Sequence, residues 1–327
     1  MNFTNTNNSI LHPSSRSINW TASSTASSRV GDEKYATAQI PYSVIHRDSP
    51  TVPLFPSLTP SPSSSSSNSN PSIITGTCGR QVSNQRLFSS RSSFNLGAFN
   101  VRTLRQLGQQ AALATTLDKM NISVCCVSET KIYDTSRILL TSPAVSEKFW
   151  LRCSGDPTAA ALGQAGVGIV LNSKAEGSLL EWIPINSRVC AVRLEGNTKA
   201  NASRSKKRCL FIISAYSPTN ASDDPAEEEF LSQLRSLIRR AKSTDIVVLA
   251  GDMNAQVGQL EESESSLGGR YSLGHTRSNN GDRLLQLCAE EHLFLASTHF
   301  RCGVRQLSTW RSPDSKHWTQ IDLIAIS

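Results

Sequence analysis

The stretch Val247-Val-Leu-Ala-Gly-Asp-Met-Asn254 decides the fold of this chain. Four apolar residues run directly into a glycine, a carboxylate and an amide, which is typical of a buried strand that ends in a polar loop. Because successive strand residues face opposite ways, Asp252 and Asn254 should share one direction if the strand geometry persists. An α/β sheet presents its site at such carboxyl ends of strands.

Three further segments repeat this design. Ala98-Phe-Asn100 ends in an amide, Cys126-Val-Ser-Glu129 ends in a carboxylate, and Gln320-Ile-Asp322 places an acid inside the last apolar run. A carboxylate within an apolar strand needs a partner, because burying an unpaired charge is costly. The four segments together predict one polar site at the strand ends.

The hydrophobic periodicity elsewhere alternates between strand and helix. Thr103 can cap a helix that runs to Met120, and further helices are predicted over 225–241 and 280–291. Strands are predicted over 94–99, 122–127, 149–153, 166–171, 179–183, 188–194, 209–215, 245–250, 293–297 and 320–326. Strands interleaved with a few helices argue for an α/β fold on mixed sheets, formed by one domain over residues 94–327.

The first 90 residues differ in composition from the rest. Ser57–Asn70 holds eight serines together with Pro60 and Pro62, and aliphatic periodicity is absent from most of the region. Such a stretch cannot bury enough apolar surface to offset about 1–2 kcal/mol of backbone entropy per residue. We therefore expect residues 1–90 to be a disordered Ser-rich tail without catalytic chemistry.

Composition argues against a membrane protein and a secreted protein. No window approaches the roughly 18 consecutive apolar residues of a membrane span, and residues 1–90 lack the apolar stretch of a signal peptide. The eight cysteines include the adjacent apolar pair Cys125 and Cys126 and no Cys-x-x-Cys spacing, which favours a reducing compartment over disulfides or zinc.

The charge distribution suits a polyanionic partner. The net charge is +7, and Arg204-Ser-Lys-Lys-Arg208 is its densest basic cluster. Basic surface gains affinity for phosphate-rich partners through counterion release. The cluster can equally be a solvated hairpin tip or a localisation signal. We expect an intracellular location, nuclear rather than cytoplasmic.

Metal-assisted phosphodiester hydrolysis is the chemistry that fits these residues. Mg²⁺, or Mn²⁺ in its place, prefers one or two carboxylates plus water and phosphate oxygens, so Glu129 with few helpers suffices. Asp252 can orient a water molecule and accept its proton. The neutral side chains of Asn100, Asn254 and Tyr216 can hold phosphoryl oxygens without cancelling the charge of the metal.

The sequence leaves a structural alternative open for each residue. Asp252 and Asn254 can form an ordinary turn, in which the side chains bond nearby backbone amides. Glu129 can be an exposed acid paired with Lys131, Asn100 can be a polar residue that flanks a helix, and Tyr216 can be a packed aromatic. Their joint occurrence, in order along the chain, favours the functional interpretation.

Six segments carry a family resemblance: Asn100-Val-Arg-Thr-Leu104, Ser128-Glu-Thr-Lys131, Ser214-Ala-Tyr-Ser-Pro218, Gly251-Asp-Met-Asn254, Ser308-Thr-Trp-Arg-Ser-Pro313 and Gln320-Ile-Asp-Leu-Ile324. In this order they resemble the endonuclease/exonuclease/phosphatase superfamily. Its fold is a four-layered α/β sandwich, with two mixed β-sheets packed face to face and helices outside. Within it, the chain looks most like the apurinic-type endonuclease domain of non-LTR retrotransposons of the RTE clade and of craniofacial-development-protein-like genes.

The resemblance implies roles around a metal for the first four segments. Glu129 would be the main metal ligand, with Asn100 beside it. Asp252 would position and activate water, and Asn254 would contact the phosphate. Tyr216 would be a second phosphate contact. Asn280-Gly-Asp-Arg283 also matches a helix start of the family and is expected to be mainly structural.

For the last two segments the resemblance implies DNA contacts and an orienting acid. Thr309 and Trp310 would lie in a loop near DNA, with Arg311 beside them, and Trp310 could pack against a sugar or base. Asp322 would orient the histidine that stabilises the pentacovalent phosphate. Because no histidine follows Asp322, we expect the final strand and its Asp-His to be missing, with an open sheet edge and a rate lower by about 10²–10³.

Three functions follow from this reasoning. The first is a Mg²⁺-dependent DNA endonuclease domain of retrotransposon origin. The second is a catalytically inactive remnant that at most binds nucleic acid or protein, and the third is a lipid or small-molecule phosphoesterase. We expect a monomer whose partner is DNA and not a membrane, and we expect His275 and His299 to be non-catalytic.

Overall fold

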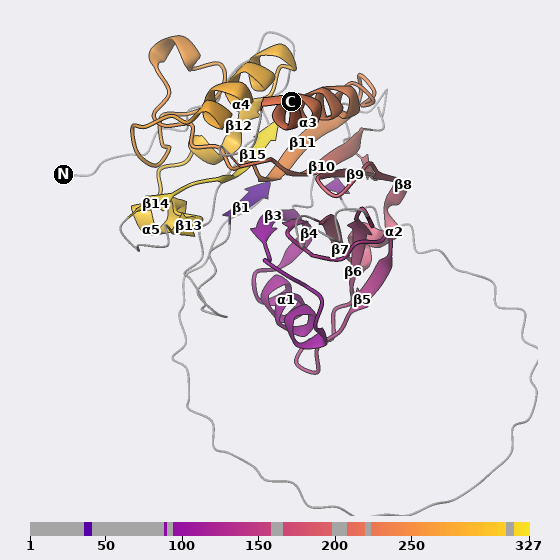
Figure 1. Cartoon of the computed structure of the whole chain (residues 1–327). Coiled ribbons are helices and arrows are strands. Elements are labelled where there is room, and N and C mark those ends of the chain that lie inside the picture. The colour runs from indigo at the N-terminus through magenta and orange to yellow at the C-terminus, as the bar shows by residue number, and fades with distance from the viewer. Residues whose placement is uncertain are drawn as a thin grey trace, which may run out of the picture. The chain divides into compact units, whose positions relative to one another are not determined.

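Two mixed β-sheets with helices on their outer faces make up the described part of the chain (Figure 1). The computed structural model describes residues 36–40, 88–89, 94–157, 166–197, 208–219, 224–311 and 317–327. All of these belong to one compact unit, made of Met1–Tyr42 and Gln85–Ser327. Within them, no helix has both the length and the apolar character needed to cross a membrane.

The first sheet is six-stranded and contains one crossover that matters for the site. Its strands β3 (Phe94–Asn100) and β4 (Ile122–Ser128) run parallel, and α1 (Leu107–Lys119) connects them, because parallel neighbours need such a crossover. The other pairs in the sheet are antiparallel. In spatial order the strands are β1 (Ala36–Ile40), β3 (Phe94–Asn100), β4 (Ile122–Ser128), β7 (Val167–Asn172), β6 (Phe149–Ser154) and β5 (Arg137–Leu140).

The second sheet is seven-stranded and contains the other crossover. Its strands β10 (Cys209–Tyr216) and β11 (Ile246–Asp252) run parallel and are connected by α3 (Asp224–Ile238). In spatial order the strands are β12 (Phe294–Leu295), β15 (Asp322–Ile326), β11 (Ile246–Asp252), β10 (Cys209–Tyr216), β9 (Val189–Asn197) and β2 (Phe88–Ser89), with β8 (Leu179–Pro184) also paired to β9.

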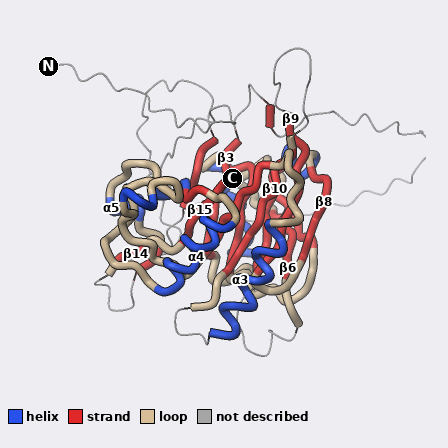
Figure 2. The backbone as a smooth tube through the Cα atoms, turned by 90° about the horizontal axis from the view of Figure 1, so that it is seen from above, coloured by secondary structure: helices blue, strands red, loops and turns tan. Residues whose placement is uncertain are grey.

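Both faces of each sheet are buried, which produces four layers. In β10, Leu210 and Ile212 face the cluster between the sheets, whereas Phe211 and Ile213 face α3 and α4 (Asn279–Glu290). The same alternation in β4 places every second residue against α1. Figure 2 shows α3 and α4 lying across the strands of the second sheet. The predicted four-layered α/β sandwich, with helices outside two facing mixed sheets, is therefore confirmed.

The predicted elements agree with the structure apart from local differences. The helix expected from Thr103 begins at Leu107, because the chain first forms a loop in which the Leu104 amide donates to Thr130 O (2.9 Å). The strand expected over 293–297 ends at Leu295 and continues as a 3₁₀ turn. The hydrophobic pattern did not indicate β5, α2 (Ser173–Gly177), α5 (Val304–Leu307) or the hairpin of β13 (Trp310–Arg311) and β14 (Trp318–Thr319).

The tail predicted over residues 1–90 differs from the structure at two places. Residues 36–40 form β1, which pairs antiparallel with residues 94–98 of β3. Residues 88–89 form β2, which pairs with the end of β9. The free edges of β3 and β9 offer backbone donors and acceptors that a short extended segment satisfies. The rest of that prediction, Ser57–Asn70 included, lies outside the described residues.

The outer edge of β15 is covered, contrary to the open edge expected from the sequence. Phe294 and Leu295 of β12 pair with Ile326 and Ala325. Beyond this pair, the Ile324 amide donates to Ser297 Oγ (2.7 Å). Every residue of β15 is buried. A short strand and one hydroxyl therefore satisfy the edge that carries Asp322 at its first position.

Candidate functional site

Four strands from the two sheets end at the candidate site. The parallel registers align Asn100 with Ser128, one residue before Glu129, and Tyr216 with Asp252. The facing sheets then place these ends next to each other, because parallel strands present their carboxyl ends at the same edge. A continuous set of hydrogen bonds joins Asn100, Glu129, Tyr216 and Asp252.

Asn100 joins the two carboxylates. Its Nδ2 donates to Glu129 Oε1 at 2.7 Å and to Asp252 Oδ2 at 2.9 Å. Its Oδ1 accepts from the amide of Arg102 at 3.0 Å, which fixes the orientation of the side chain. Arg102 has a positive φ of 54°, so the chain turns sharply after the strand. Two acids from different sheets therefore share one amide group.

Glu129 follows β4 in a strained backbone conformation. Its φ is +56°, and that of Lys131 is +53°, values uncommon for residues with side chains. Between them, the Thr130 amide donates to Gly166 O (2.9 Å), which holds the turn. The Glu129 carboxylate accepts from Asn100 and from Tyr216 Oη (3.2 Å). Within the described residues no ion pair joins it to Lys131, so the alternative of an exposed Glu–Lys pair does not hold.

Asp252 is the buried acid of the group, with 2% of its surface exposed. Its Oδ2 accepts from Asn100, and its Oδ1 accepts from the amide of Asn254 (3.0 Å). Burial raises the pKa of Asp252 from 3.8 to about 6. The hydrogen bonds from Asn100 and Asn254 oppose this rise, and the nearby Glu129 charge adds to it.

Asn254 departs from the strand geometry assumed in the sequence analysis. β11 ends at Asp252, and Asn254 has a φ of +44°. The strand geometry that would give the two side chains one common direction therefore does not continue to Asn254. Asn254 Nδ2 donates to Ser217 O (2.8 Å), while Asn280 Nδ2 donates to Asn254 O (3.2 Å) and to Pro218 O (2.9 Å). The turn expected as an alternative is present, and it forms part of the site by tying the ends of β10 and β11 together.

Tyr216 connects Glu129 to Arg188, a residue that no sequence motif indicated. Its ring is half-buried, and the guanidinium of Arg188 lies 5.2 Å from the ring centroid. Burial and the two nearby carboxylates raise the pKa of the phenol. Arg188 precedes β9 and carries no local sequence signal of function, because only the antiparallel register of β9 and β10 brings it to Tyr216.

Asp322 lies beside this group in an unusual environment. It is the register partner of Asp252 and has 2% of its surface exposed. Thr309 Oγ1 accepts from the backbone amides of Ile321 (3.0 Å) and Asp322 (3.1 Å). Within the described part of the chain, Asp322 Oδ1 has no hydrogen-bond partner. Burial first, and the charge of Asp252 second, raise the pKa of Asp322 well above its ordinary value.

Trp310 and Arg311 lie on the β13–β14 hairpin, outside the hydrogen-bonded group. Trp310 has 41% and Trp318 has 37% of its surface exposed, and the Arg311 guanidinium lies 4.9 Å from the Trp318 ring centroid. Thr309 is their connection to the site, through its hydrogen bond with the Asp322 backbone. His299 packs edge-on against Phe294 and not against the acids.

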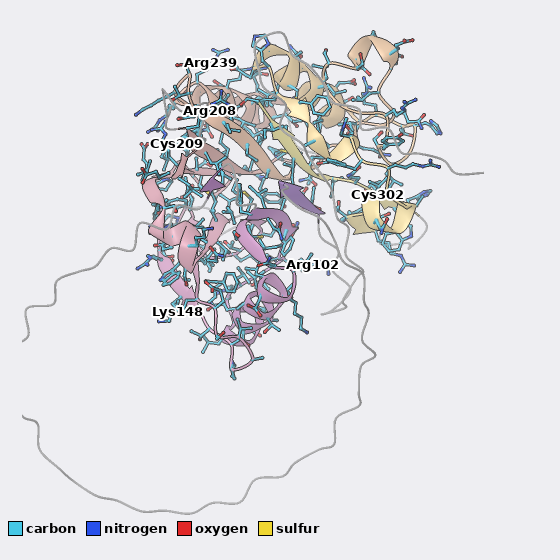
Figure 3. The ribbon with its side chains drawn as sticks, turned by 180° about the vertical axis from the view of Figure 1, so that it is seen from behind. Arg102, Lys148, Arg208, Cys209, Arg239 and Cys302 are labelled. Carbon is cyan, nitrogen blue, oxygen red and sulfur yellow. The ribbon has the colours of Figure 1, made fainter. Side chains whose placement is uncertain are left out.

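The basic cluster 204–208 is described only at Arg208, which precedes β10. Tyr216 ends the same strand, so roughly eight residues at about 3.3 Å each separate Arg208 from the site. Figure 3 likewise shows Arg208 and Cys209 on the other side from Arg102, which follows Asn100. The cluster therefore does not contribute charge at the site through Arg208.

The donor set of the site suits a hard divalent cation. No group of three or more His, Cys, Asp or Glu side chains suited to a metal occurs among the described residues. Mg²⁺ does not require one, since it is commonly held by one or two carboxylates and keeps several waters. Glu129 and Asp252 lie within hydrogen-bond reach of one amide nitrogen. Asn100 Oδ1 retains a second lone pair beyond the one that faces Arg102.

Comparison with known proteins identifies relatives by sequence. A sequence model of the Endonuclease/Exonuclease/phosphatase family matches residues 92–320. Craniofacial development protein 2 of Bos taurus and of Tragulus javanicus are each 26% identical over 234 residues, which cover 72% of this chain. The matched residues make up 36% and 37% of those two proteins, so the chain spans about a third of the length of the curated relatives it matches.

Solved structures give more distant matches. The catalytic domain of APE2 from Xenopus laevis is 14% identical, with a TM-score of 0.44 over 71% of this chain and 82% of that one. The AP endonuclease LMAP from Leishmania major is also 14% identical, with a TM-score of 0.46 over 70% of this chain and 77% of that one.

Proposed function

The chain belongs to the endonuclease/exonuclease/phosphatase family, as its six segments predicted, and from this premise we propose that it hydrolyses phosphodiester bonds in DNA with the help of a divalent metal ion. The fold is that of the phosphodiesterases and nucleases of this superfamily. The substrate, the metal and the retrotransposon origin of the domain are parts of the proposal.

One observation carries the proposal. Glu129 and Asp252 come from different sheets, yet the same amide nitrogen of Asn100 lies 2.7 Å from one carboxylate and 2.9 Å from the other. Two acids held this close destabilise the fold unless something compensates for their charge. A divalent cation supplies that compensation, and a structural role alone gives no reason for bringing the two acids together.

The residues present define how the site would act. Glu129, with Asn100, would hold Mg²⁺ or Mn²⁺, which supplies charge stabilisation at the phosphate when bound. Asp252, with a pKa raised to about 6, is suited to orient a water molecule and to take its proton near neutral pH. Tyr216 Oη and Asn254 Nδ2 are neutral donors that can turn toward phosphoryl oxygens.

Asp322 would orient a further donor toward the phosphate. Its Oδ1 is buried and has no partner among the described residues, although the carboxyl group lies beside Asp252. This is the environment expected for an acid that holds a histidine or another donor in place. The described residues do not supply that donor, so the same observation favours a second candidate, a domain that binds nucleic acid without cleaving it.

DNA is the substrate that the surroundings of the site favour. The β13–β14 hairpin exposes two tryptophans and Arg311, and aromatic and cationic side chains together bind bases and phosphates. Thr309 ties this hairpin to Asp322. We propose Thr309, Trp310 and Arg311 as the DNA-contacting residues of a monomeric, nuclear protein.

A plasmid-nicking assay tests the proposal. The full chain is incubated with supercoiled plasmid and Mg²⁺, with Mn²⁺ and with EDTA, and the expected result is nicking that requires the metal. Glu129→Gln should lose this activity, whereas Glu228→Gln, which changes a 70% exposed acid on α3, should keep it. Nicking that persists in Glu129→Gln would overturn the assignment of the site.

Two other outcomes separate the remaining candidates. DNA binding in a gel-shift assay without nicking in either metal would favour the binding domain. Release of phosphate from inositol lipids, with plasmid left intact, would favour a lipid phosphoesterase.

A further inference from the structure

Arg188 makes three contacts with a single residue of the site. Its guanidinium carbon lies 5.2 Å from the centroid of the Tyr216 ring. Its Nη1 donates to Tyr216 O at 3.2 Å, and its own backbone oxygen accepts from the Tyr216 amide at 2.8 Å. The backbone bond extends the β9–β10 ladder by one residue beyond the pair Val189–Ala215. Ring, carbonyl and amide of Tyr216 are therefore all held by Arg188.

The backbone of Arg188 is itself anchored, through Asn186, to two other elements. Asn186 Oδ1 accepts from the amides of Arg188 (2.9 Å) and Val189 (3.0 Å). Asn186 Nδ2 donates to Gln233 Oε1 on α3 at 2.6 Å, and Asn186 O accepts from Ser154 Oγ on β6 at 2.7 Å. The turn between β8 and β9 is thus bonded to α3, outside the second sheet, and to β6 of the first sheet, and Arg188 cannot shift without breaking these bonds.

The charge of Arg188 is kept in a partly buried position. Burial lowers the pKa of its guanidinium, and the nearby Glu227 carboxylate opposes that effect. Glu227 is 5% exposed and comes from α3. An arginine remains protonated under such conditions. A guanidinium held over an aromatic face is attracted by the ring quadrupole, more strongly when the pair is shielded from water.

From these contacts we infer that Arg188 is a positioning residue for Tyr216, which it holds with the phenol directed at Glu129. The inference rests on the proposed function for its catalytic consequence. Tyr216 Oη lies 3.2 Å from Glu129 Oε1, and within the described part of the chain no hydrogen bond or ion pair joins Arg188 to Glu129 or Asp252. Arg188 therefore acts through Tyr216, by covering one face of its ring and so limiting the rotation of the ring about its side-chain bonds.

Fluorine NMR tests the positioning directly. The chain contains five tyrosines, so 3-fluorotyrosine labelling gives a small set of signals, and Tyr216→Phe identifies the signal of Tyr216. Arg188→Met keeps an unbranched apolar side chain of similar length and removes the charge and the donors. We expect the Tyr216 signal to shift and to broaden in Arg188→Met, while the other four signals stay in place.

The chain offers a matched control on the same strand. Arg193 of β9 lies 5.1 Å from the Phe211 ring centroid and pairs with Asp245 and Glu181. Arg193→Met removes a stacked arginine and at least as many polar contacts, but far from Tyr216. It should leave the Tyr216 signal unchanged, which separates positioning from general destabilisation.

Kinetics give the second measurement. If wild type nicks DNA, Arg188→Met should lower kcat by about 10- to 100-fold with little change in KM, because a displacement of about 1 Å from a remote change costs up to about 10² in rate. Arg188→Lys should not restore the rate, since an ammonium lacks the planar stacking surface.

Two results would overturn the inference. One is a Tyr216 signal that is unchanged in Arg188→Met. The other is full recovery of the signal and the rate in Arg188→Lys, which would make charge alone responsible. If wild type does not nick DNA, the proposed function fails, but the NMR result still decides whether Arg188 positions Tyr216.

Discussion

Replacing Asn100 by alanine is the perturbation whose effect the structure defines best. The side chain donates from one nitrogen to the carboxylates of Glu129 and Asp252. Removing it leaves two acids close together without their common donor. Asp252 is buried and has no solvent to replace the lost bond, whereas Glu129 is half-buried and keeps the bond from Tyr216. The variant should therefore lose stability chiefly through Asp252.

The size of the loss depends on pH. A hydrogen bond to a charged group contributes about 1.5–3 kcal/mol, so losing both bonds should lower the free energy of unfolding by about 3–6 kcal/mol at pH 8. The pKa of Asp252 is raised to about 6 by burial. At pH 5 this group is mostly protonated, and a neutral bond contributes only about 0.5–1.5 kcal/mol. We expect the loss at pH 5 to be smaller by about 1–2 kcal/mol.

Urea denaturation followed by circular dichroism, in EDTA at pH 5 and pH 8, measures this difference. Asn95→Ala is the matched control, because Asn95 lies on the same strand and donates to the neutral carbonyls of Met120 (3.4 Å) and Asn121 (2.9 Å). Its loss should be the same at both pH values. If Asn100→Ala also loses the same amount at pH 5 and pH 8, Asn100 does not stabilise an ionised Asp252 and the reasoning is refuted.

Three further predictions concern the same region. The pKa of Asp252 is about 6 in the folded protein against 3.8 ordinarily, so between these pH values the folded state keeps a proton that the unfolded state releases. The free energy of unfolding in EDTA should therefore fall by about 2–3 kcal/mol as the pH rises from about 4 to 6. In urea titrations the Asp252→Asn variant should lack this fall, and parallel pH profiles for variant and wild type would contradict the raised pKa. Gly251→Ala should lower the free energy of unfolding by more than about 4 kcal/mol, since Gly251 has a φ of +149° and an added Cβ would overlap Ala215 O. The control Gly108→Ala, in α1 with nothing near the added carbon, should instead raise it by up to about 1 kcal/mol. Equal thermal midpoints for the two variants would disprove the steric argument. Mg²⁺ should raise the melting temperature more at pH 8 than at pH 5, because at pH 5 the metal must compete with the proton on Asp252. The rise should vanish in Glu129→Gln. A rise that survives in this variant would place the metal elsewhere.

The elements of the core could be predicted because each carries its own periodicity. The runs 209–213 and 246–250 are apolar at every position, since both faces of the second sheet are buried. The adjacent cysteines Cys125 and Cys126 are both fully buried, on opposite faces of β4, as small apolar residues should be. Short elements such as β5 and the β13–β14 hairpin were missed, because two to four residues are too few to show a period.

The family resemblance and the strand-end pattern also predicted which polar residues meet. Asn100, Glu129, Tyr216 and Asp252 were selected from separate segments, and the structure joins all four by hydrogen bonds. Arg188 could not be found this way. No local motif marks it, and its contact with Tyr216 depends on the register of β9 against β10.

The sequence by itself determined the four-layered fold, the polar residues at the strand ends and the family, because periodicity and local order of motifs are properties of the chain. Only the tertiary structure decided that Asn254 leaves the strand direction, that Asn100 presents its nitrogen to two acids, and that Arg188 covers the Tyr216 ring. These arrangements depend on side-chain orientation and on contacts between residues distant in sequence, which arise when the two sheets pack and water is excluded from between them.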